Sequence, residues 1–431
     1  MIQKNYCRYL CTAMNKKHKI ELMAPAGSYE ALRAAIHAGC DSVYFGVEQF
    51  NMRARATMNF TMEDLEKVGA ICRENNVRSY LTLNTIVYDH DLTAIKTVLD
   101  KAKAGGITAV IASDQAVIAY ARSIQMEVHI STQVNITNIE TVKFYALFAD
   151  TMVLSRELSL IQVKKICGQI EKENICGPSG KPVEIEIFVH GALCMAVSGK
   201  CYLSLHTANA SANRGACVQN CRRSYTVIDN EDGHELAIDN EYIMSAQDLC
   251  TIDFLDKVIE SGVKVMKIEG RGKGADYVKT TVECYREAVE AYYNNTYTKE
   301  KIADWMERLQ RVYNRGFWSG YYLGKELGEW NDSPGSKATT RKIYLGKGTN
   351  YFDKIRVAEF KLESYDLSLG DTVLITGPTT GAIETTITEL HTSEGAVQTA
   401  KKGENCAFRL DTPIRTSDKL YKIVNAIETT A

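Results

Sequence analysis

Short apolar runs alternate with longer stretches of helical period from residue 19 to about residue 295. This alternation is typical of repeated βα units. The eight strands that it predicts span residues 20–24, 42–46, 80–83, 109–112, 127–130, 151–154, 184–189 and 264–268. Helices are predicted at 29–37, 62–75 and 92–104, and Thr61 with Asp64 forms a capping-box pattern at the start of the second. Val278, Val282 and Val289 mark a further amphipathic helix after the last strand.

Eight parallel strands with connecting helices predict a (β/α)8 TIM-like barrel, whose active site lies at the carboxyl ends of the strands. A doubly wound open sheet is the alternative. The connection between the seventh and eighth strands is about seventy residues long, and long loops of that kind are usually functional. We therefore expect the chemistry near this insertion, at about residues 191–250.

The rest of the chain predicts a second domain. Residues 299–330 read as a helix and an aromatic, Gly-rich segment, and the polar run 331–340 reads as a linker. The segments 356–362, 372–376, 382–390 and 419–423 alternate around Gly-containing turns, which predicts a small antiparallel β-barrel. The expected domains are an extension at 1–18, a catalytic domain at 19–330 and a C-terminal barrel at 341–431.

Composition narrows the class of protein. Of the 431 residues, 45% are apolar and 24% are charged, which is typical of a soluble globular protein. The formal net charge of -2 gives no overall positive field, although a local basic patch can still attract phosphates. No run of eighteen apolar residues and no signal-peptide core occur, so we expect a cytoplasmic protein that does not enter membranes.

The long insertion contains four cysteines, Cys194, Cys201, Cys217 and Cys221, within a stretch of 28 residues. Four thiolates on a polar loop can converge on one metal centre, and soft sulfur ligands select zinc, copper or an iron–sulfur cluster. Structural zinc sites favour thiols two to four residues apart, and only Cys217 and Cys221 approximate that spacing. The spacing alone leaves zinc and iron–sulfur open. Cys250, at the start of an expected buried helix, could replace one ligand.

Other polar residues follow the predicted strands at the catalytic face. The candidate catalytic groups are His129, Glu157 and Glu269, and the candidate substrate-binding groups are Arg53, Arg55, Gln133, Asn135, Arg156 and Arg271. Arg pairs with carboxylates through paired hydrogen bonds, so this set suits a small substrate that bears carboxylates. The glycine-rich turn 270–274 could bind an anion or could simply connect a strand to a helix.

Hydrolysis has little local support. Ser131, Ser155 and Ser204 do not lie in a Gly-x-Ser-x-Gly elbow, and no His-Glu-x-x-His motif occurs. Around the cysteines, Lys200, Arg214, Arg222 and Arg223 form a cationic segment with Tyr202 and Tyr225, which could stack on RNA bases or could be a solvated loop face.

Several segments together resemble the collagenase-like peptidase family U-32. They are residues 21–27, 186–194, 198–204, 213–217 and 267–271, with Cys221 and Arg222. The resemblance implies a 4Fe-4S cluster on Cys194, Cys201, Cys217 and Cys221. It also implies oxygen-independent, prephenate-dependent hydroxylation of a tRNA wobble uridine to 5-hydroxyuridine. The implied partners are tRNA, a small carboxylate co-substrate and an electron-transfer protein.

Three alternatives remain. The chain could be a U-32-type peptidase that acts on collagen-like peptides, a hydroxylase of another RNA or of a small molecule, or a zinc-stabilised RNA-binding module without catalysis.

Overall fold

The structure is a computed structural model. It describes residues 20–48, 50–52, 54, 59–226, 242, 244–324, 328–332 and 335–426. Among these residues no helix is long and apolar enough to cross a membrane.

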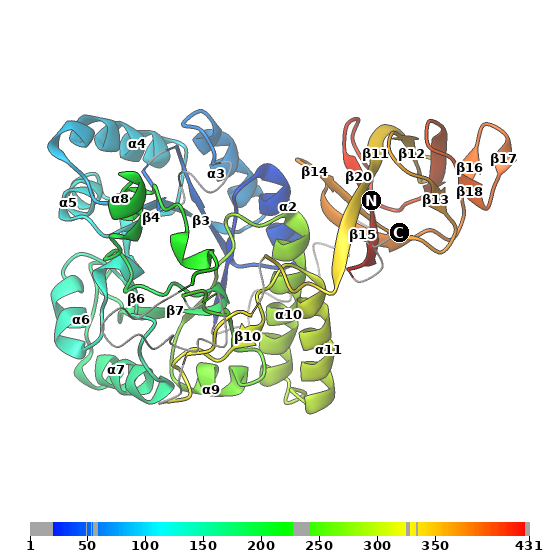
Figure 1. Cartoon of the computed structure of the whole chain (residues 1–431). Helices are drawn as coiled ribbons and strands as arrows, with labels where there is room; N and C mark the ends of the chain where they lie inside the picture. The colour runs from blue at the N-terminus through cyan, green and yellow to red at the C-terminus, as the bar shows by residue number, and fades with distance from the viewer. Residues whose placement is uncertain are drawn as a thin grey trace.

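Eight parallel strands form a closed barrel, as the sequence predicts (Figure 1). The strands are β1 (Glu21–Pro25), β2 (Ser42–Gly46), β3 (Arg78–Leu83), β4 (Ala109–Ala112), β5 (Glu127–Ile130), β6 (Thr151–Val153), β7 (Glu184–Ala192) and β9 (Val265–Ile268). The barrel closes because β9 pairs in parallel with both β7 and β1. This closure excludes the doubly wound open sheet.

Helices pack around the outside of the barrel (Figure 1). They are α2 (Tyr29–His37), α3 (Asp64–Glu74), α4 (Leu92–Ala104), α5 (Gln115–Ser123), α6 (Ile139–Tyr145), α7 (Leu160–Glu173), α9 (Leu255–Glu260), α10 (Ala275–Tyr293) and α11 (Lys299–Arg311). Each of the longer helices buries an apolar face; α3, for example, buries Leu65, Val68 and Cys72. The helix begins at Asp64 and not at residue 62 as predicted, although the Asp64 carboxylate accepts hydrogen bonds from the backbone N–H and the hydroxyl of Thr61.

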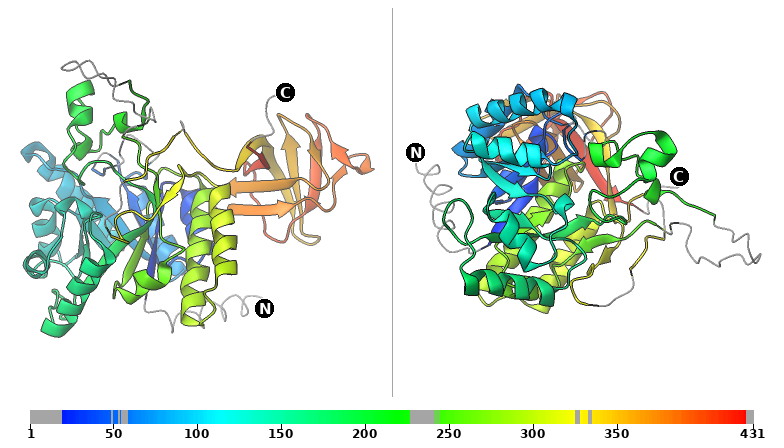
Figure 2. Two further views of the ribbon diagram at one scale, coloured as in Figure 1. Left: turned by 60° about the horizontal axis from the view of Figure 1, so that its bottom comes forward. Right: turned by 90° about the vertical axis from the view of Figure 1, so that its left-hand side faces the viewer.

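The long insertion, residues 193–264, is called the crossover here. It carries the short helix α8 (Leu203–Ala208) and the strand β8 (Asp248–Cys250). The α8 segment, in green, projects from one end of the barrel (Figure 2). Strand β8 pairs antiparallel with the end of β7, so that Ala192 lies directly opposite Asp248, and β10 (Phe317–Trp318) extends the same edge.

The prediction that Cys250 starts a helix is wrong. Cys250 lies in β8 opposite His190 of β7, and α9 begins only at Leu255. The three residues of β8 are buried and pair with β7, so the tertiary contact decides their conformation.

The C-terminal domain is an antiparallel sheet. Its eight strands are β11 (Thr340–Phe352), β12 (Val357–Leu362), β14 (Thr372–Gly377), β15 (Gly381–Thr386), β16 (His391–Thr392), β17 (Gly395–Ala396), β19 (Asn405–Arg409) and β20 (Lys419–Asn425). Strands β13 (Leu367–Ser368) and β18 (Thr399–Ala400) form a separate pair. The longest strand, β11, is absent from the sequence prediction because it is interrupted by bulges at Gly346 and near Gly348 and has few buried side chains.

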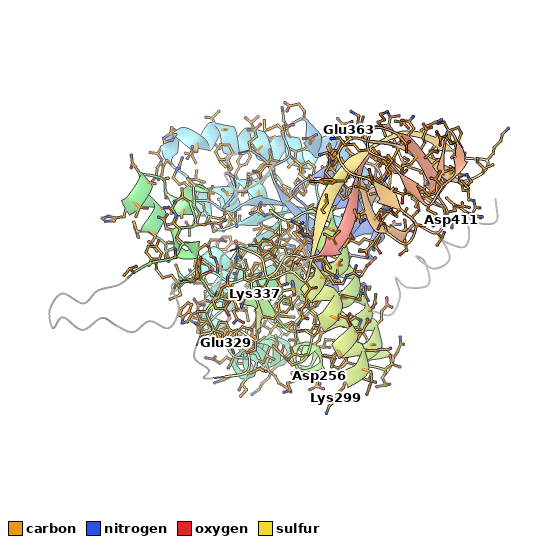
Figure 3. All side chains as sticks on the ribbon, turned by 45° about the vertical axis from the view of Figure 1, so that its right-hand side comes forward. Asp256, Lys299, Glu329, Lys337, Glu363 and Asp411 are labelled. Carbon is orange, nitrogen blue, oxygen red and sulfur yellow. The ribbon has the colours of Figure 1, made fainter. Side chains whose placement is uncertain are left out.

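The sheet packs against α2 and α10 at the side of the barrel (Figure 1). An apolar cluster of Ala34, Ala275, Leu374 and Ala382 joins the two domains. Gly381 has a φ of +74°, and a Cβ there would lie 3.0 Å from the backbone nitrogen of Ala34, so glycine permits this close approach. Figure 3, from another side, shows the labelled Glu363 and Asp411 on the sheet, well away from Asp256 and Lys299 at the foot of the barrel domain.

Candidate active site

A cavity of about 430 Å³ lies at the carboxyl ends of the barrel strands, between the strands and the crossover. All four predicted ligand cysteines, Cys194, Cys201, Cys217 and Cys221, line it. Four predicted polar residues, Gln133, Arg156, Glu269 and Arg271, line it as well. The structure therefore brings most of the predicted site together, at the end of the barrel where such sites occur.

The crossover places the cysteines on irregular backbone. Cys194 is the second residue after β7 and is exposed, while the other three are partly buried. Burial raises the pKa of the Cys221 thiol, the neighbouring Arg222 opposes this rise, and the other three thiolates add to it. The other three sulfurs thus lie within electrostatic reach of Cys221. Within the described part of the chain, however, no three His, Cys, Asp or Glu side chains are set closely enough to hold a metal ion as they stand.

Buried polar contacts fix the crossover to the barrel. The Arg222 guanidinium donates hydrogen bonds to the carbonyl oxygens of Leu193 and Ala246, both at 2.6 Å. Asn135 donates to the carbonyl oxygen of Ser198 at 2.9 Å. Gly215 has a φ of +82°, and a Cβ there would lie 2.4 Å from the carbonyl oxygen of Asn51. These contacts hold the cysteine-bearing loops over the barrel mouth.

Cations line the strand side of the cavity. Arg271 donates hydrogen bonds to Thr82 at 2.7 Å and to Asn51 at 3.0 Å. Arg156 lies over the Phe188 ring at 3.9 Å and donates to the carbonyl oxygen of Ala192. The other cations that line the cavity are Arg222, Lys267, Lys273 and Arg315. A cavity with this lining suits an anionic substrate.

Some predicted residues take other places. His129 is fully buried inside the barrel and does not line the cavity. Glu157 hydrogen-bonds the hydroxyl of Ser155 and also lies outside the lining, as does Asn135. Arg53 and Arg55 lie outside the described residues, so their predicted role in substrate binding stays a prediction.

Some side chains of the predicted cationic RNA-binding segment form contacts within the protein and are not available to bind RNA. Arg214 pairs with Asp91 at 2.7 Å, and Arg222 is occupied by backbone carbonyl groups. Lys200, Arg223 and Tyr202 are exposed near the cavity mouth. The free surface is therefore smaller than the sequence suggests.

The sequence prediction missed Lys267, Tyr44 and Arg315 in the lining, whereas Lys273 belongs to the turn 270–274 that was predicted as a possible anion site. Lys267 was assigned to a strand and to the family-like segment 267–271 but to no site, although an isolated Lys within a buried run is itself a signal. Tyr44 lies in the middle of β2, where an aromatic residue ordinarily belongs to the core. Its hydroxyl donates to the Glu269 carboxylate at 2.9 Å and so orients a predicted catalytic group.

The serines do not form a hydrolase triad. Ser131 contacts Gln133, Ser155 contacts Glu157, and the Ser204 hydroxyl accepts from the backbone of Val218. Among the described contacts none of these hydroxyls meets a histidine. The buried His190 is also a poor base, because burial lowers its pKa to about 3.

Comparison with known proteins extends this picture. The chain is 56% identical over 402 residues to a protein named collagenase from Porphyromonas gingivalis, covering 93% of this chain and 97% of the relative. It is 38% identical over 413 residues to an uncharacterized protease of Methanocaldococcus jannaschii, covering 95% and 99%. It is also 28% identical over 426 residues to tRNA hydroxylation protein P1 of Bacillus subtilis, covering 96% and 98%. Residues 27–332 match the family model described as peptidase family U32, and the chain belongs to that family.

Proposed function

We propose that this chain is an RNA hydroxylase that holds a 4Fe-4S cluster on Cys194, Cys201, Cys217 and Cys221. In this proposal it converts a tRNA wobble uridine to 5-hydroxyuridine without oxygen, with prephenate as co-substrate and a separate electron donor. The single observation that supports it best is the cavity itself. Four cysteines and six cations line one cavity, and in the described part of the chain the hydroxyl groups of Ser131, Ser155 and Ser204 contact no histidine.

The donor set fits a cluster better than a single zinc ion. Zinc needs four sulfurs at about 2.3 Å from one point, and the thiols are not gathered so closely. They nevertheless line one cavity and act electrostatically on one another. A cube of iron and sulfide takes one thiolate at each of four separated corners, so it suits four ligands that share a cavity without converging on one point. When bound, such a cluster supplies one-electron chemistry.

The protein's own groups would do the rest. Arg156 and Arg271 lie where they can bind carboxylates of a small anion. Glu269, held by Tyr44, can orient a substrate hydroxyl or amide. Exposed Tyr202 and Lys200 at the mouth could hold a nucleotide by stacking and charge, since stacking does not depend on the base. The tRNA hydroxylation name of the Bacillus relative supports RNA as the substrate.

A peptidase is the second candidate, because the Porphyromonas relative at 56% identity is named collagenase. One set of measurements separates the two. The protein is purified without oxygen and assayed for iron and sulfide, and tRNA nucleosides are analysed from a deletion strain complemented with the wild-type or the Cys217→Ser gene. The same protein is incubated with denatured collagen.

We expect about four irons per chain, consistent with one 4Fe-4S cluster. We also expect 5-hydroxyuridine derivatives that return with the wild-type gene only. Colourless, iron-free protein that cleaves collagen with unchanged tRNA would refute the proposal and favour the peptidase.

A further inference from the structure

A row of ionisable side chains runs through the interior of the barrel. Glu127 Oε1 lies 3.1 Å from His129 Nε2, both on β5. His129 Nδ1 lies 3.8 Å from Glu186 Oε2 on β7, and Glu186 Oε1 lies 2.8 Å from Lys267 Nζ on β9. Both His129 and Glu186 are fully buried. Three neighbouring contacts therefore link four titratable groups across three strands.

The two ends of this row reach different surfaces. Glu127 begins β5, at the end of the barrel away from the cavity; its side chain is 30% exposed and pairs with Arg78 at 2.6 Å. Lys267 is almost buried but lines the cavity, with its ammonium over the Tyr44 ring at 4.4 Å. The row therefore extends from solvent at the amino ends of the barrel strands to the cavity at their carboxyl ends.

Stability does not explain these groups. Replacing a buried ion pair by apolar side chains is often neutral or stabilising, and barrel interiors are usually filled by branched apolar residues. The same interior already contains Met23, Ile111 and Val265. Buried charges with specific charged partners beside a cavity are candidates for a functional role.

One junction in the row lacks its hydrogen bond. His129 Nδ1 and Glu186 Oε2 are buried and face each other, and neither atom has a hydrogen-bond partner in the described part of the chain. Buried polar atoms are nearly always paired. A small ring rotation would close this gap, and catalytic hydrogen bonds are often long before the substrate binds.

We propose that Lys267 is a proton donor to the cavity and that Glu186 and His129 are positioning residues that return a proton to it from the Glu127 end. The Lys267 N–H bond breaks as its proton passes to negative charge that develops on the bound substrate. His129 Nδ1 passes its proton to the Glu186 carboxylate, and the resulting carboxyl group rotates and passes that proton to the Lys267 amine, so Glu186 ends as a carboxylate. The neutral imidazole keeps its proton at Nε2; the ring then turns so that the unprotonated nitrogen faces Glu127 and takes up a proton from solvent there, and no electrons are transferred.

The surroundings favour a charged His129 in the resting protein. It is faced by Glu127 on its own strand, by Glu186 on β7 and by the Tyr80 ring on β3, with Arg78, Glu21 and Glu184 farther away. Burial lowers the pKa of His129, but the two carboxylates outweigh burial and raise it above its usual range. For Glu186, burial raises the pKa, and Lys267 and His129 outweigh burial and lower it.

The first test needs no enzymatic activity. The C2 proton resonance of His129 is followed by NMR against pH in the full-length protein and identified by its loss in His129→Gln. We expect the midpoint to fall by about one pH unit in Glu186→Gln, which removes a facing carboxylate, and to rise in Lys267→Met, which removes a cation. If the titration midpoint of His129 does not change in variants that fold, the proposed coupling between these four side chains is wrong. If Glu186→Gln does not fold, Lys267→Met decides alone.

The second test separates a proton donor from a fixed charge, and it depends on the proposed function. Lys267→Arg keeps the cation, but guanidinium does not release its proton. We expect kcat for uridine hydroxylation to fall on the order of a hundredfold with KM little changed, and His129→Gln to flatten the pH profile. Full kcat in Lys267→Arg would overturn the donor role. If the wild-type protein hydroxylates no uridine, the proposed function fails, and the NMR midpoints still decide the row.

Discussion

The two walls of the cavity are built in different ways. On the strand side, Lys267 and Arg271 are almost buried and are held by Glu186, Asn51 and Thr82 on neighbouring elements. On the crossover side, Cys194, Cys201 and Cys217 lie on loops and Cys221 lies on a 3-10 turn, and Cys194 is exposed. The strand wall is therefore fixed by the fold, whereas the crossover wall rests on a few polar contacts.

This difference indicates that the strand wall and the crossover wall have different roles. Strands hold the groups whose charge and position must be constant, because neighbouring strands restrict every side chain between them. Loops hold ligands that can adjust around a bound group, and metal binding can then contribute to the order of the loop. Substitutions in the two walls should consequently affect different properties of the protein.

The largest effect should follow from the loss of one ligand. Cys217→Ser should lose the cluster iron and the 5-hydroxyuridine activity, while the thermal unfolding of the barrel stays near that of the wild type. Cys250→Ser is the matched control, because Cys250 is buried beside Tyr285 and does not line the cavity. Iron and sulfide assays with circular dichroism measure both. Full iron in Cys217→Ser would contradict the assignment of ligands.

A smaller effect should follow from loosening the crossover. Arg222→Ala removes hydrogen bonds to Leu193, Ala246 and Ser245, and each bond from a charged donor contributes roughly 1.5–3 kcal/mol. We expect proteolysis within residues 194–226 to become faster by tenfold or more, with the barrel left intact. The control variant Arg223→Ala changes an exposed neighbouring residue, and we expect the protease to cleave it at the wild-type rate. Equal rates in the two variants would mean that Arg222 does not anchor the crossover.

The smallest effect concerns acid stability of the strand wall. Burial raises the pKa of Glu127, but His129 and Arg78 outweigh burial and lower it to about 2. A carboxylate with a depressed folded pKa stabilises the protein above its unfolded value, about 4.3, and this contribution is lost as the pH falls toward 2. Glu127→Gln should remove on the order of 2 kcal/mol of unfolding free energy at pH 6 and less at pH 3.

Urea unfolding at the two pH values measures this change. The exposed Glu140 on α6 supplies the control Glu140→Gln, whose effect should be small and similar at both values. If Glu127→Gln lowers the free energy of unfolding as much at pH 3 as at pH 6, the pKa of Glu127 is not depressed.

The sequence predicted the barrel well and grouped the four cysteines that line the cavity, because strand periodicity and closely spaced thiols are local signals. It did not predict Lys267 as a cavity residue. The run 265–268 looks like any buried strand, and only closure of the barrel turns that side chain inward. His129 was expected at the catalytic face, but it lies within β5, whose bounds were predicted, and its fully buried side chain does not reach the cavity. Strand β11 and the place of Cys250 depend on tertiary pairing, which no local pattern records.

The pairing of Ala192 with Asp248 has an evolutionary consequence. The part of the crossover between β7 and β8, residues 193–247, begins and ends beside two residues that face each other across an antiparallel pair. A tight hairpin turn could connect those residues directly, so the intervening segment can be excised or exchanged without breaking the ring of strands. Ancestral barrels could thus have acquired a cysteine-bearing graft at this position in a single insertion, and laboratory transplantation between homologues should use the same two junctions.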